Sequence, residues 1–220
     1  MKAACVVVWT MLLATLAAIT AAKEPDGNAW EGAIARFESI DRENMPAPGG
    51  IVFVGSSSIR LWDTKESFPD LAITNRGFGG SQASDVLEFA DRIVIQYRPR
   101  LIAFYAGDND LAAGETPQQV LADFRAFADQ VFAALPETKI LFLAIKPSPA
   151  RIKLLDTQER ANRLIEEYCQ QAPRLTFVDL AAVLLDDQGQ PIDKYYAPDR
   201  LHLSAAGYEA WTKALRPLLK

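Results

Sequence analysis

The chain contains a single histidine, His202, so no other imidazole is available to act as a base at neutral pH. Asp199 lies three residues before it, a spacing at which a carboxylate can hold the ring in one tautomer, as a Ser-His-Asp system requires. A lone histidine near an aspartate is more often a structural or surface residue. The interpretation as a base therefore depends on whether the chain also supplies a nucleophile and donors for an oxyanion.

Three further segments offer those groups, and each has a plainer alternative. Gly55-Ser56-Ser57-Ser58 can present a serine hydroxyl, or one serine simply caps the next helical turn. The glycines of Asn75-Arg76-Gly77-Phe78-Gly79-Gly80-Ser81 leave backbone N–H groups open to a ligand oxygen, or they serve a tight turn. In Ala106-Gly107-Asp108-Asn109-Asp110, the Asn109 amide can donate to an oxyanion, or the segment is an ordinary Asx turn.

The elements that must position these segments are predicted from the apolar pattern. Short continuous apolar runs alternate with segments whose apolar residues recur at helical spacing. The predicted strands are 51–54, 71–74, 101–105, 139–145 and 175–178, and the predicted helices are 30–40, 86–97, 116–131, 156–171 and 204–218. This alternation predicts a three-layer α/β/α domain with a five-stranded parallel sheet. Ligand sites in such folds lie at the carboxyl ends of the strands, where the first three segments fall.

The first 22 residues predict a secretory signal. Lys2 precedes an apolar run, residues 3–18, and small residues at 20–22 suggest cleavage after Ala22. An uncleaved N-terminal anchor is the alternative, although the run is short for a stable span and no cluster of charged residues follows it. Residues 23–220 are enough for one domain with a full core. We therefore expect an exported protein, periplasmic or secreted, without stable membrane insertion after cleavage.

Composition excludes several function classes. The net charge is -5, and loss of Lys2 would make it -6, with no basic stripe of the kind that nucleic-acid binding needs. Only Cys169 would remain after cleavage, so an intramolecular disulfide is excluded. One histidine and one cysteine leave almost no room for a zinc site, and Asp108 with Asp110 are too few for a hard cation. Nothing in the sequence requires a metal or a cofactor.

Taken together, the four segments resemble the SGNH (GDSL-type) hydrolases, which are esterases with a flavodoxin-like sheet. The resemblance covers the chain from Ile51 to the final helix. Gly107-Asp108-Asn109-Asp110 matches the family pattern G-x-N-D, and Asp199-Arg200-Leu201-His202 matches D-x-x-H. The resemblance implies one SGNH-like domain over residues 23–220 and hydrolysis of carboxylic esters through an acyl-enzyme.

The resemblance also implies a role for each site residue. Ser57, second after the glycine, is the expected nucleophile, with Asp199 as the orienting acid and His202 as the base. The Ser57 and Gly80 backbone N–H groups and the Asn109 amide are the expected oxyanion donors. One departure is that Ser56 replaces the family's usual aspartate beside the nucleophile. The change leaves three consecutive serines and blurs which one attacks.

The substrate is less well determined by the sequence. Trp62, Phe78 and Asp108 lie beside the expected catalytic residues and could line a pocket, although the aromatic residues could equally belong to the core. The charges of the segment 146–151 could face an anionic or sugar substrate. Because no lid or long apolar insertion is visible, we expect a small or short-chain ester. The resemblance implies acetyl esters on carbohydrate, lysophospholipid or thioester as options. The alternative is a non-catalytic exported module that binds an anion or glycan on the same fold.

Overall fold

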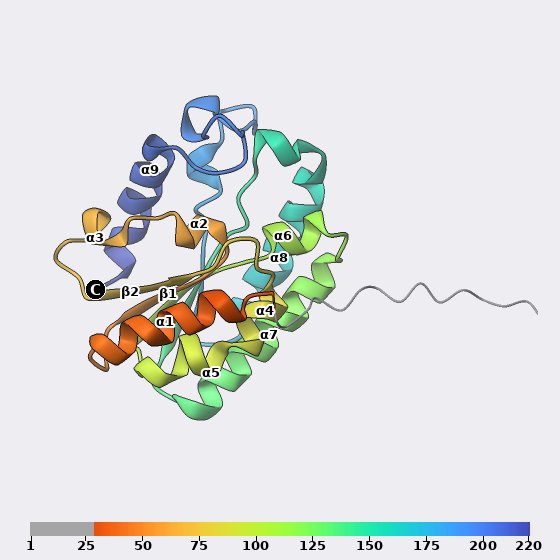
Figure 1. The fold of residues 1–220 in the computed structure, drawn as a ribbon. Coiled ribbons are helices and arrows are strands. Elements are labelled where there is room, and N and C mark those ends of the chain that lie inside the picture. The colour runs from red at the N-terminus through yellow and green to blue at the C-terminus, as the bar shows by residue number, and fades with distance from the viewer. Residues whose placement is uncertain (1–28) are drawn as a thin grey trace, which may run out of the picture.

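The computed structural model describes residues 29–220, so the predicted signal, residues 1–22, lies outside the described part of the chain. A five-stranded parallel sheet forms the centre, in the order β2-β1-β3-β4-β5 (Figure 1). This is the flavodoxin-like order, and the predicted fold class is confirmed. The strands are β1 (Ile51–Gly55), β2 (Ile73–Gly77), β3 (Leu101–Tyr105), β4 (Lys139–Leu143) and β5 (Leu175–Val178).

Helices cover both faces of the sheet, because each buried strand is apolar on both sides. Val52 and Val54 of β1 face one core together with α1, α4, α5, α7 and α8, whereas Ile51 and Phe53 face a second core with α2, α3 and α9 (Figure 1). The helices are α1 (Glu31–Glu43), α2 (Ser57–Arg60), α3 (Thr64–Ser67), α4 (Ala83–Glu88), α5 (Ala90–Ile93), α6 (Asp108–Ala112), α7 (Pro117–Ala134), α8 (Leu155–Cys169) and α9 (Ala205–Leu215). None of the helices within residues 29–220 is both long and apolar enough to cross a membrane.

The second strand differs from its prediction. It was expected at 71–74, but β2 runs from Ile73 to Gly77 and takes in the start of the glycine-rich segment. The polar residues are accommodated because they find partners: the Asn75 amide donates to the Ile59 and Trp62 carbonyl oxygens at 2.8 and 3.1 Å. The prediction was wrong because apolarity alone cannot show that a polar strand residue will be satisfied.

The single helix predicted over 86–97 was also wrong. The segment forms α4, α5 and a short 3₁₀ turn, Ile95–Tyr97, with breaks at Phe89 and Val94. The second break falls inside the run Ile93-Val94-Ile95, and three β-branched residues in a row lower helix propensity. The remaining predicted strands and helices agree with the structure to within a few residues at their ends.

A buried ion pair attaches α1 to the edge strand. Arg76 of β2 lies 2.5 Å from the Asp41 carboxylate of α1, and its Nε donates to the Tyr97 hydroxyl at 2.8 Å. The guanidinium also lies over the rings of Phe37 and Tyr97, with its carbon 5.0 and 4.8 Å from their centroids. Both charged side chains are almost fully buried, so each charge needs the other to offset the cost of its removal from water.

Removing Asp41 should therefore be costly. We expect Asp41→Ala to lower the free energy of unfolding by about 3–5 kcal/mol, because it leaves the Arg76 charge buried and unpaired. Glu38→Ala is a matched control, since Glu38 is also on α1 and pairs with Arg92, but at a half-exposed position. Its cost should stay below about 1 kcal/mol. Urea unfolding followed by tryptophan fluorescence measures both, and equal costs would contradict the role given to the buried pair.

Candidate active site

A pocket of about 360 Å³ opens at the carboxyl ends of the central strands. Its lining includes five of the predicted site residues, Ser57, Gly80, Asp108, Asn109 and His202. Ser57 follows β1, Gly80 follows β2, and Asn109 follows β3. Because β1 lies between β2 and β3, the three segments converge at the switch point of the sheet, where α/β folds place their ligands.

Ser57, His202 and Asp199 form a continuous hydrogen-bonded chain. The Ser57 Oγ lies 3.0 Å from the His202 Nε2, and the His202 Nδ1 lies 2.6 Å from the Asp199 Oδ2. Ser57 and His202 are 145 residues apart in the sequence, so the contact exists only in the folded chain. The geometry is that of a hydroxyl whose proton can pass to an imidazole held by a carboxylate.

The three consecutive serines have different surroundings. Ser57 is the first residue of α2 and is half-buried at the pocket, with its hydroxyl on His202. Ser56 and Ser58 are buried, with exposed fractions of 2% and 3%. The Ser56 N–H donates to the Tyr105 carbonyl oxygen, and the Ser58 carbonyl oxygen accepts from the Tyr208 hydroxyl. Of the three, Ser57 is therefore the serine whose hydroxyl is open both to the pocket and to the imidazole.

A tight turn sets the position of the imidazole. The Asp199 Oδ1 accepts hydrogen bonds from the Leu201 and His202 backbone N–H groups at 2.9 and 3.0 Å, while its other oxygen faces the ring. Arg200, between them, adopts a left-handed conformation with φ 59°. The hydrogen bond from His202 and those from the two N–H groups lower the pKa of Asp199 to about 2, so the residue stays ionised at any pH at which the protein would normally work.

Candidate donors for an oxyanion line the same pocket as Ser57. Within residues 29–220 the Ser57 and Gly80 N–H groups have no backbone acceptor, and Gly80 has φ 88°, a left-handed conformation that suits glycine. The Asn109 amide is held at both ends: its oxygen accepts from Arg151 at 3.1 Å, and its nitrogen donates to the Ser81 carbonyl oxygen at 3.0 Å. This fixes which end of the amide is the nitrogen and leaves it a second N–H to donate.

Asp108 is a buried carboxylate in the lining of the pocket. Its carboxylate lies 2.7 Å from Arg151 and 3.2 Å from Lys146, and it accepts from the Gln158 amide at 3.3 Å. Burial tends to raise the pKa of Asp108, but the two nearby cations outweigh that effect, and the pKa lies below its ordinary value. Asp108 thus lines the pocket as predicted, but as an ion-paired residue that organises Lys146 and Arg151.

The two aromatic residues predicted to line the pocket do not do so. Trp62 and Phe78 have exposed fractions of 2% and 1%, and both belong to the hydrophobic cores. The Trp62 indole packs 5.5 Å from that of Trp211, and its Nε1 donates to the Ser67 and Thr212 hydroxyls. Their closeness in sequence to site residues was misleading because both side chains turn toward a helix layer.

Asp110 joins the two glycine-containing segments. Its Oδ1 accepts from the Ala83 N–H at 2.7 Å, at the end of the segment that holds Gly80, and its Oδ2 accepts from the Gly107 N–H at 2.9 Å. Burial is the main reason why the pKa of Asp110 rises to about 7, and the nearby Glu115 carboxylate adds to it. The Asp110 side chain therefore connects the segment that holds Gly80 to the segment that holds Asn109 through two hydrogen bonds.

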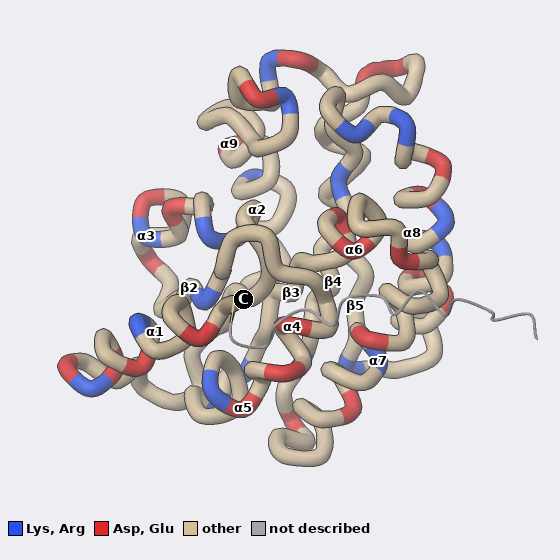
Figure 2. The backbone as a smooth tube through the Cα atoms, turned by 45° about the vertical axis from the view of Figure 1, so that its right-hand side comes forward, with Lys and Arg blue, Asp and Glu red and all other residues tan. Residues whose placement is uncertain are grey.

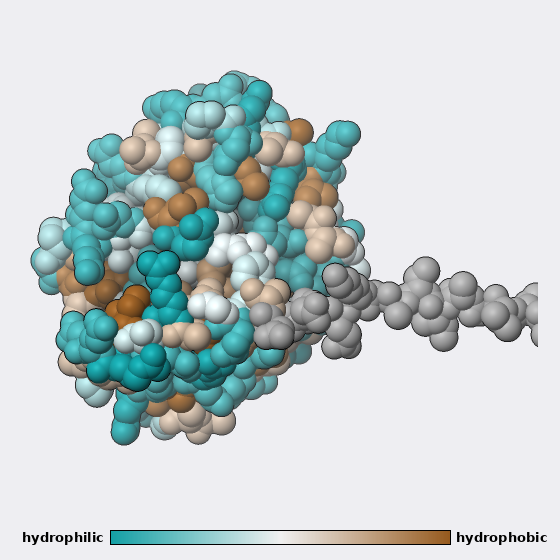
Figure 3. Space-filling model, in the orientation of Figure 1, coloured by the Kyte–Doolittle hydropathy of each residue, from teal (hydrophilic) through white to brown (hydrophobic). Residues whose placement is uncertain are grey.

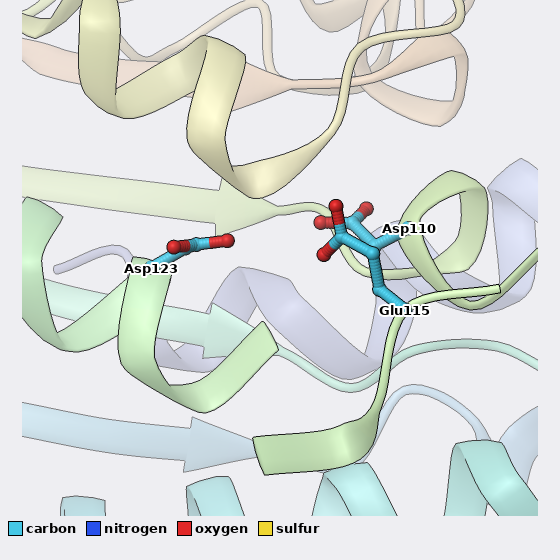
Figure 4. A group of neighbouring side chains, drawn as sticks. All are labelled: Asp110, Glu115 and Asp123. Atoms are coloured by element: carbon cyan, nitrogen blue, oxygen red, sulfur yellow. The ribbon is translucent and has the colours of Figure 1, made fainter. Parts of the chain in front are cut away.

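Asp110 also belongs to a small group of carboxylates. Its side chain lies beside those of Glu115 and Asp123, with one oxygen of each within 4.8 Å of the others (Figure 4). Asp110 and Glu115 come from α6 and the segment after it, and Asp123 points toward them from α7. Burial raises the pKa of Glu115 and of Asp123. Both Asp110 oxygens already accept hydrogen bonds from backbone N–H groups, and burial is the main cause of each raised pKa.

Sequence reasoning did not single out Arg60, which lines the pocket from the last turn of α2. Lys146 and Arg151 were noted only as charges on a segment, although Lys146 comes shortly after β4 and so near a strand's carboxyl end. Gln158 and Asp110 were also missed as supports of the site. Position after a strand could have indicated Lys146, but nothing in the local sequence reveals that Arg60 and Arg151 line the same pocket.

The raised pKa of Asp110 predicts a pH dependence of stability. Between about pH 4 and 7 the folded protein retains a proton that the unfolded chain has released, so this contribution to stability is lost as the pH rises. Asp110→Asn has no such proton. We therefore expect the unfolding free energy of the wild type, relative to that of Asp110→Asn, to decrease by on the order of 1–4 kcal/mol from pH 4.5 to 7.5.

Urea titrations at three pH values measure this difference. Asp129→Asn, at an exposed position of α7, is the matched control and should give a much smaller pH-dependent difference. A difference between wild type and Asp110→Asn that stays constant with pH would contradict the raised pKa.

Comparisons with known proteins agree with this geometry. The chain matches the GDSL-like Lipase/Acylhydrolase family over residues 61–210, a range that contains Asn109, Asp199 and His202 and begins just after Ser57. No curated protein matches the chain in sequence. Among solved structures, a Streptococcus pneumonia protein provisionally named as a platelet activating factor is 26% identical, with a TM-score of 0.79 over 88% of this chain and 94% of its own.

Two further structures share the fold at lower identity. A GDSL-like lipase from Bacteroides thetaiotaomicron is 18% identical, with a TM-score of 0.72 over 84% of this chain and 96% of its own. An acetylxylan esterase from Geobacillus stearothermophilus is 17% identical, with a TM-score of 0.62 over 77% and 94%. With more than half of the residues matched by the family, and with the site at the expected edge of the sheet, the chain belongs to the GDSL-like lipase/acylhydrolase family and is a carboxylic ester hydrolase.

Proposed function

We propose that this protein hydrolyses small or short-chain esters through an acyl-enzyme formed on Ser57. The observation that carries the proposal is the chain of two hydrogen bonds from the Ser57 Oγ through His202 to the Asp199 carboxylate. The family match begins after Ser57, so the assignment of the nucleophile depends on this geometry and not on the match. Ser56, which stands where the family usually has an aspartate, is buried, and the hydroxyl that meets the imidazole is that of Ser57.

The reaction follows from the positions of the three side chains. His202 Nε2 accepts the Ser57 proton as Oγ attacks the ester carbonyl carbon, and the imidazolium then donates that proton to the departing alcohol. A water molecule enters next, gives a proton to His202 and attacks the acyl carbon. The bond between the acyl carbon and the Ser57 Oγ then breaks as His202 returns the proton to Oγ, which releases the acid and restores Ser57. Asp199 holds the ring by Nδ1 throughout and stabilises its positive charge.

The negative charge on the carbonyl oxygen needs preorganised donors. The Ser57 and Gly80 N–H groups and the free N–H of the Asn109 amide supply them in this proposal. Arg151 contributes indirectly, since its hydrogen bond to the Asn109 oxygen keeps the amide nitrogen turned toward Ser81 and the pocket. The buried Asp108 in turn holds Arg151 in place.

The size and polarity of the pocket favour a small substrate. About 360 Å³ suits a short acyl group with a compact alcohol, and the lining is mostly polar or charged. On the face drawn in Figure 3, hydrophobic residues form small separate areas among hydrophilic ones. The Geobacillus structure described as an acetylxylan esterase makes acetylated carbohydrate one candidate substrate. We also propose export, to the periplasm or the medium, on the basis of the signal-like residues 1–22.

Labelling by a fluorophosphonate tests the nucleophile. The folded protein should react on the peptide that contains Ser57, since only an activated serine attacks phosphorus at a useful rate. Ser57→Ala should abolish both labelling and the hydrolysis of 4-nitrophenyl acetate. Peptide mass mapping identifies the labelled residue, and the absorbance of the released 4-nitrophenol at about 400 nm measures hydrolysis.

Ser56→Ala and Ser58→Ala are the matched controls for that experiment. Both should remain labelled at residue 57, because neither hydroxyl contacts His202. Labelling that survives in Ser57→Ala, or an absence of labelling in correctly folded wild-type protein, would refute the proposed nucleophile.

Asn109→Ala tests the proposed oxyanion donor. It should lower kcat on the order of 10²–10³-fold with little change in KM, because the donor acts on charge that appears only in the transition state. The exposed Asn44→Ala, at the end of α1, serves as a control of matched chemistry. If Asn109→Ala instead raised KM and left kcat unchanged, Asn109 would be a substrate-binding residue and not an oxyanion donor.

A further inference from the structure

Arg60 places a cation at the active-site pocket. It ends α2, three residues after Ser57, is exposed, and lines the same pocket as Ser57, Gly80 and His202. None of the ion pairs found within residues 29–220 involves its guanidinium. Its charge and its donors are therefore available to a ligand in the pocket.

The other two cations that line the pocket already form ion pairs within the protein. Lys146 and Arg151 both contact the Asp108 carboxylate, and Arg151 also donates to the Asp108 carbonyl oxygen and to Asn109. One carboxylate cannot neutralise two cations, so this cluster retains a net positive charge next to Arg60. Among the residues that line the pocket, Arg60, Lys146 and Arg151 are cations, whereas Asp108 is an anion.

The charge of the pocket contrasts with that of the whole chain. The protein carries a net charge of -5, and acidic and basic residues are intermixed over the backbone (Figure 2). The pocket thus carries a local excess of positive charge although the protein as a whole is acidic. Such a region concentrates anions and repels cations near the reacting serine.

Gly79 makes room for the Arg60 side chain. A Cβ at Gly79 would lie 2.7 Å from the Arg60 Nε and 3.2 Å from its Cζ, which shows that the guanidinium packs directly over the glycine. Gly79 does not have a positive φ, whereas its neighbour Gly80 does. The missing side chain at residue 79 is therefore explained by the space that Arg60 occupies and not by backbone conformation.

We propose that Arg60 binds an anionic group, a carboxylate or a phosphate, on the ester that this enzyme hydrolyses. The inference rests on the proposed function, since it concerns the substrate of the same site, and it narrows the substrate to an anionic ester. Arginine suits the task because its planar donors match two oxygens of either anion at once. Because Arg60 is exposed, solvent and salt screen the contact, and the expected selectivity is moderate.

The test compares charged and neutral esters on wild type and on Arg60→Gln. To place the negative charge on the acyl group, the 4-nitrophenyl monoester of succinic acid is compared with the neutral 4-nitrophenyl butyrate. To place it on the alcohol, 4-acetoxybenzoate and 4-acetoxyphenyl phosphate are compared with the neutral 4-acetoxybenzamide. Comparing each ester on both enzymes cancels its intrinsic reactivity. In at least one pair, the anionic-to-neutral ratio of kcat/KM should fall about tenfold in Arg60→Gln, the equivalent of one charge-assisted contact.

A second variant and a control protect the test from misinterpretation. Gly79→Ala should reduce the same ratio, because its methyl group displaces the Arg60 guanidinium while leaving its charge in the protein. Arg163→Gln removes an equal charge from an exposed position on α8 outside the pocket, and it should leave the ratio unchanged. Raising the salt concentration should lower the wild-type ratio and have little effect on that of Arg60→Gln.

The outcomes separate this inference from the proposed function. If every ester is hydrolysed but Arg60→Gln leaves all the ratios unchanged, Arg60 does not recognise an anion and the inference is overturned. If Arg163→Gln lowers the ratio as much as Arg60→Gln, the effect reflects overall charge, which also overturns it. If the wild type hydrolyses none of the esters and Ser57 is not labelled, the proposed function itself fails.

Discussion

The parallel pairing of β1 with both β2 and β3 is the constraint on which the site depends. Gly55, the last residue of β1, lies opposite Gly77 on one side and Tyr105 on the other, so three strands end at the same level. The packing there is so close that a Cβ on Gly55 would lie 1.8 Å from the Tyr105 carbonyl oxygen. This close approach, possible only for glycine, brings the nucleophile and two candidate oxyanion donors to one edge of the sheet.

Two buried carboxylates maintain that arrangement beyond the strand ends. Asp110 holds the Gly80 and Asn109 segments through their backbone N–H groups, and Asp108 holds Arg151, which in turn orients the Asn109 amide. They differ in electrostatic environment. Asp108 has two cations beside it and a lowered pKa, whereas Asp110 has only neutral donors, a nearby carboxylate and a raised pKa. The two aspartates therefore both support the site, Asp108 through ion pairs and Asp110 through hydrogen bonds from neutral N–H groups.

The predicted fold and the observed fold agree where the sequence carries a strong periodic signal. β3 and β5 begin and end at the predicted residues because they are continuous apolar runs. β2 was misplaced because Asn75 and Arg76 look like loop residues until Ile59, Trp62 and Asp41 provide their partners. The aromatic residues beside the site were misassigned for a related reason. Sequence position does not tell which way a side chain turns, and Trp62 turns into the core.

The sequence by itself determined the layered fold, the family and the small set of residues that could carry proton transfer, because each depends on local patterns of residue type and spacing. Only the tertiary structure decided that Ser57, and not Ser56 or Ser58, meets the imidazole, and that Arg60 and Arg151 face the same pocket. Those contacts join segments up to 145 residues apart. Their geometry is set by strand pairing and core packing, which no short stretch of sequence contains.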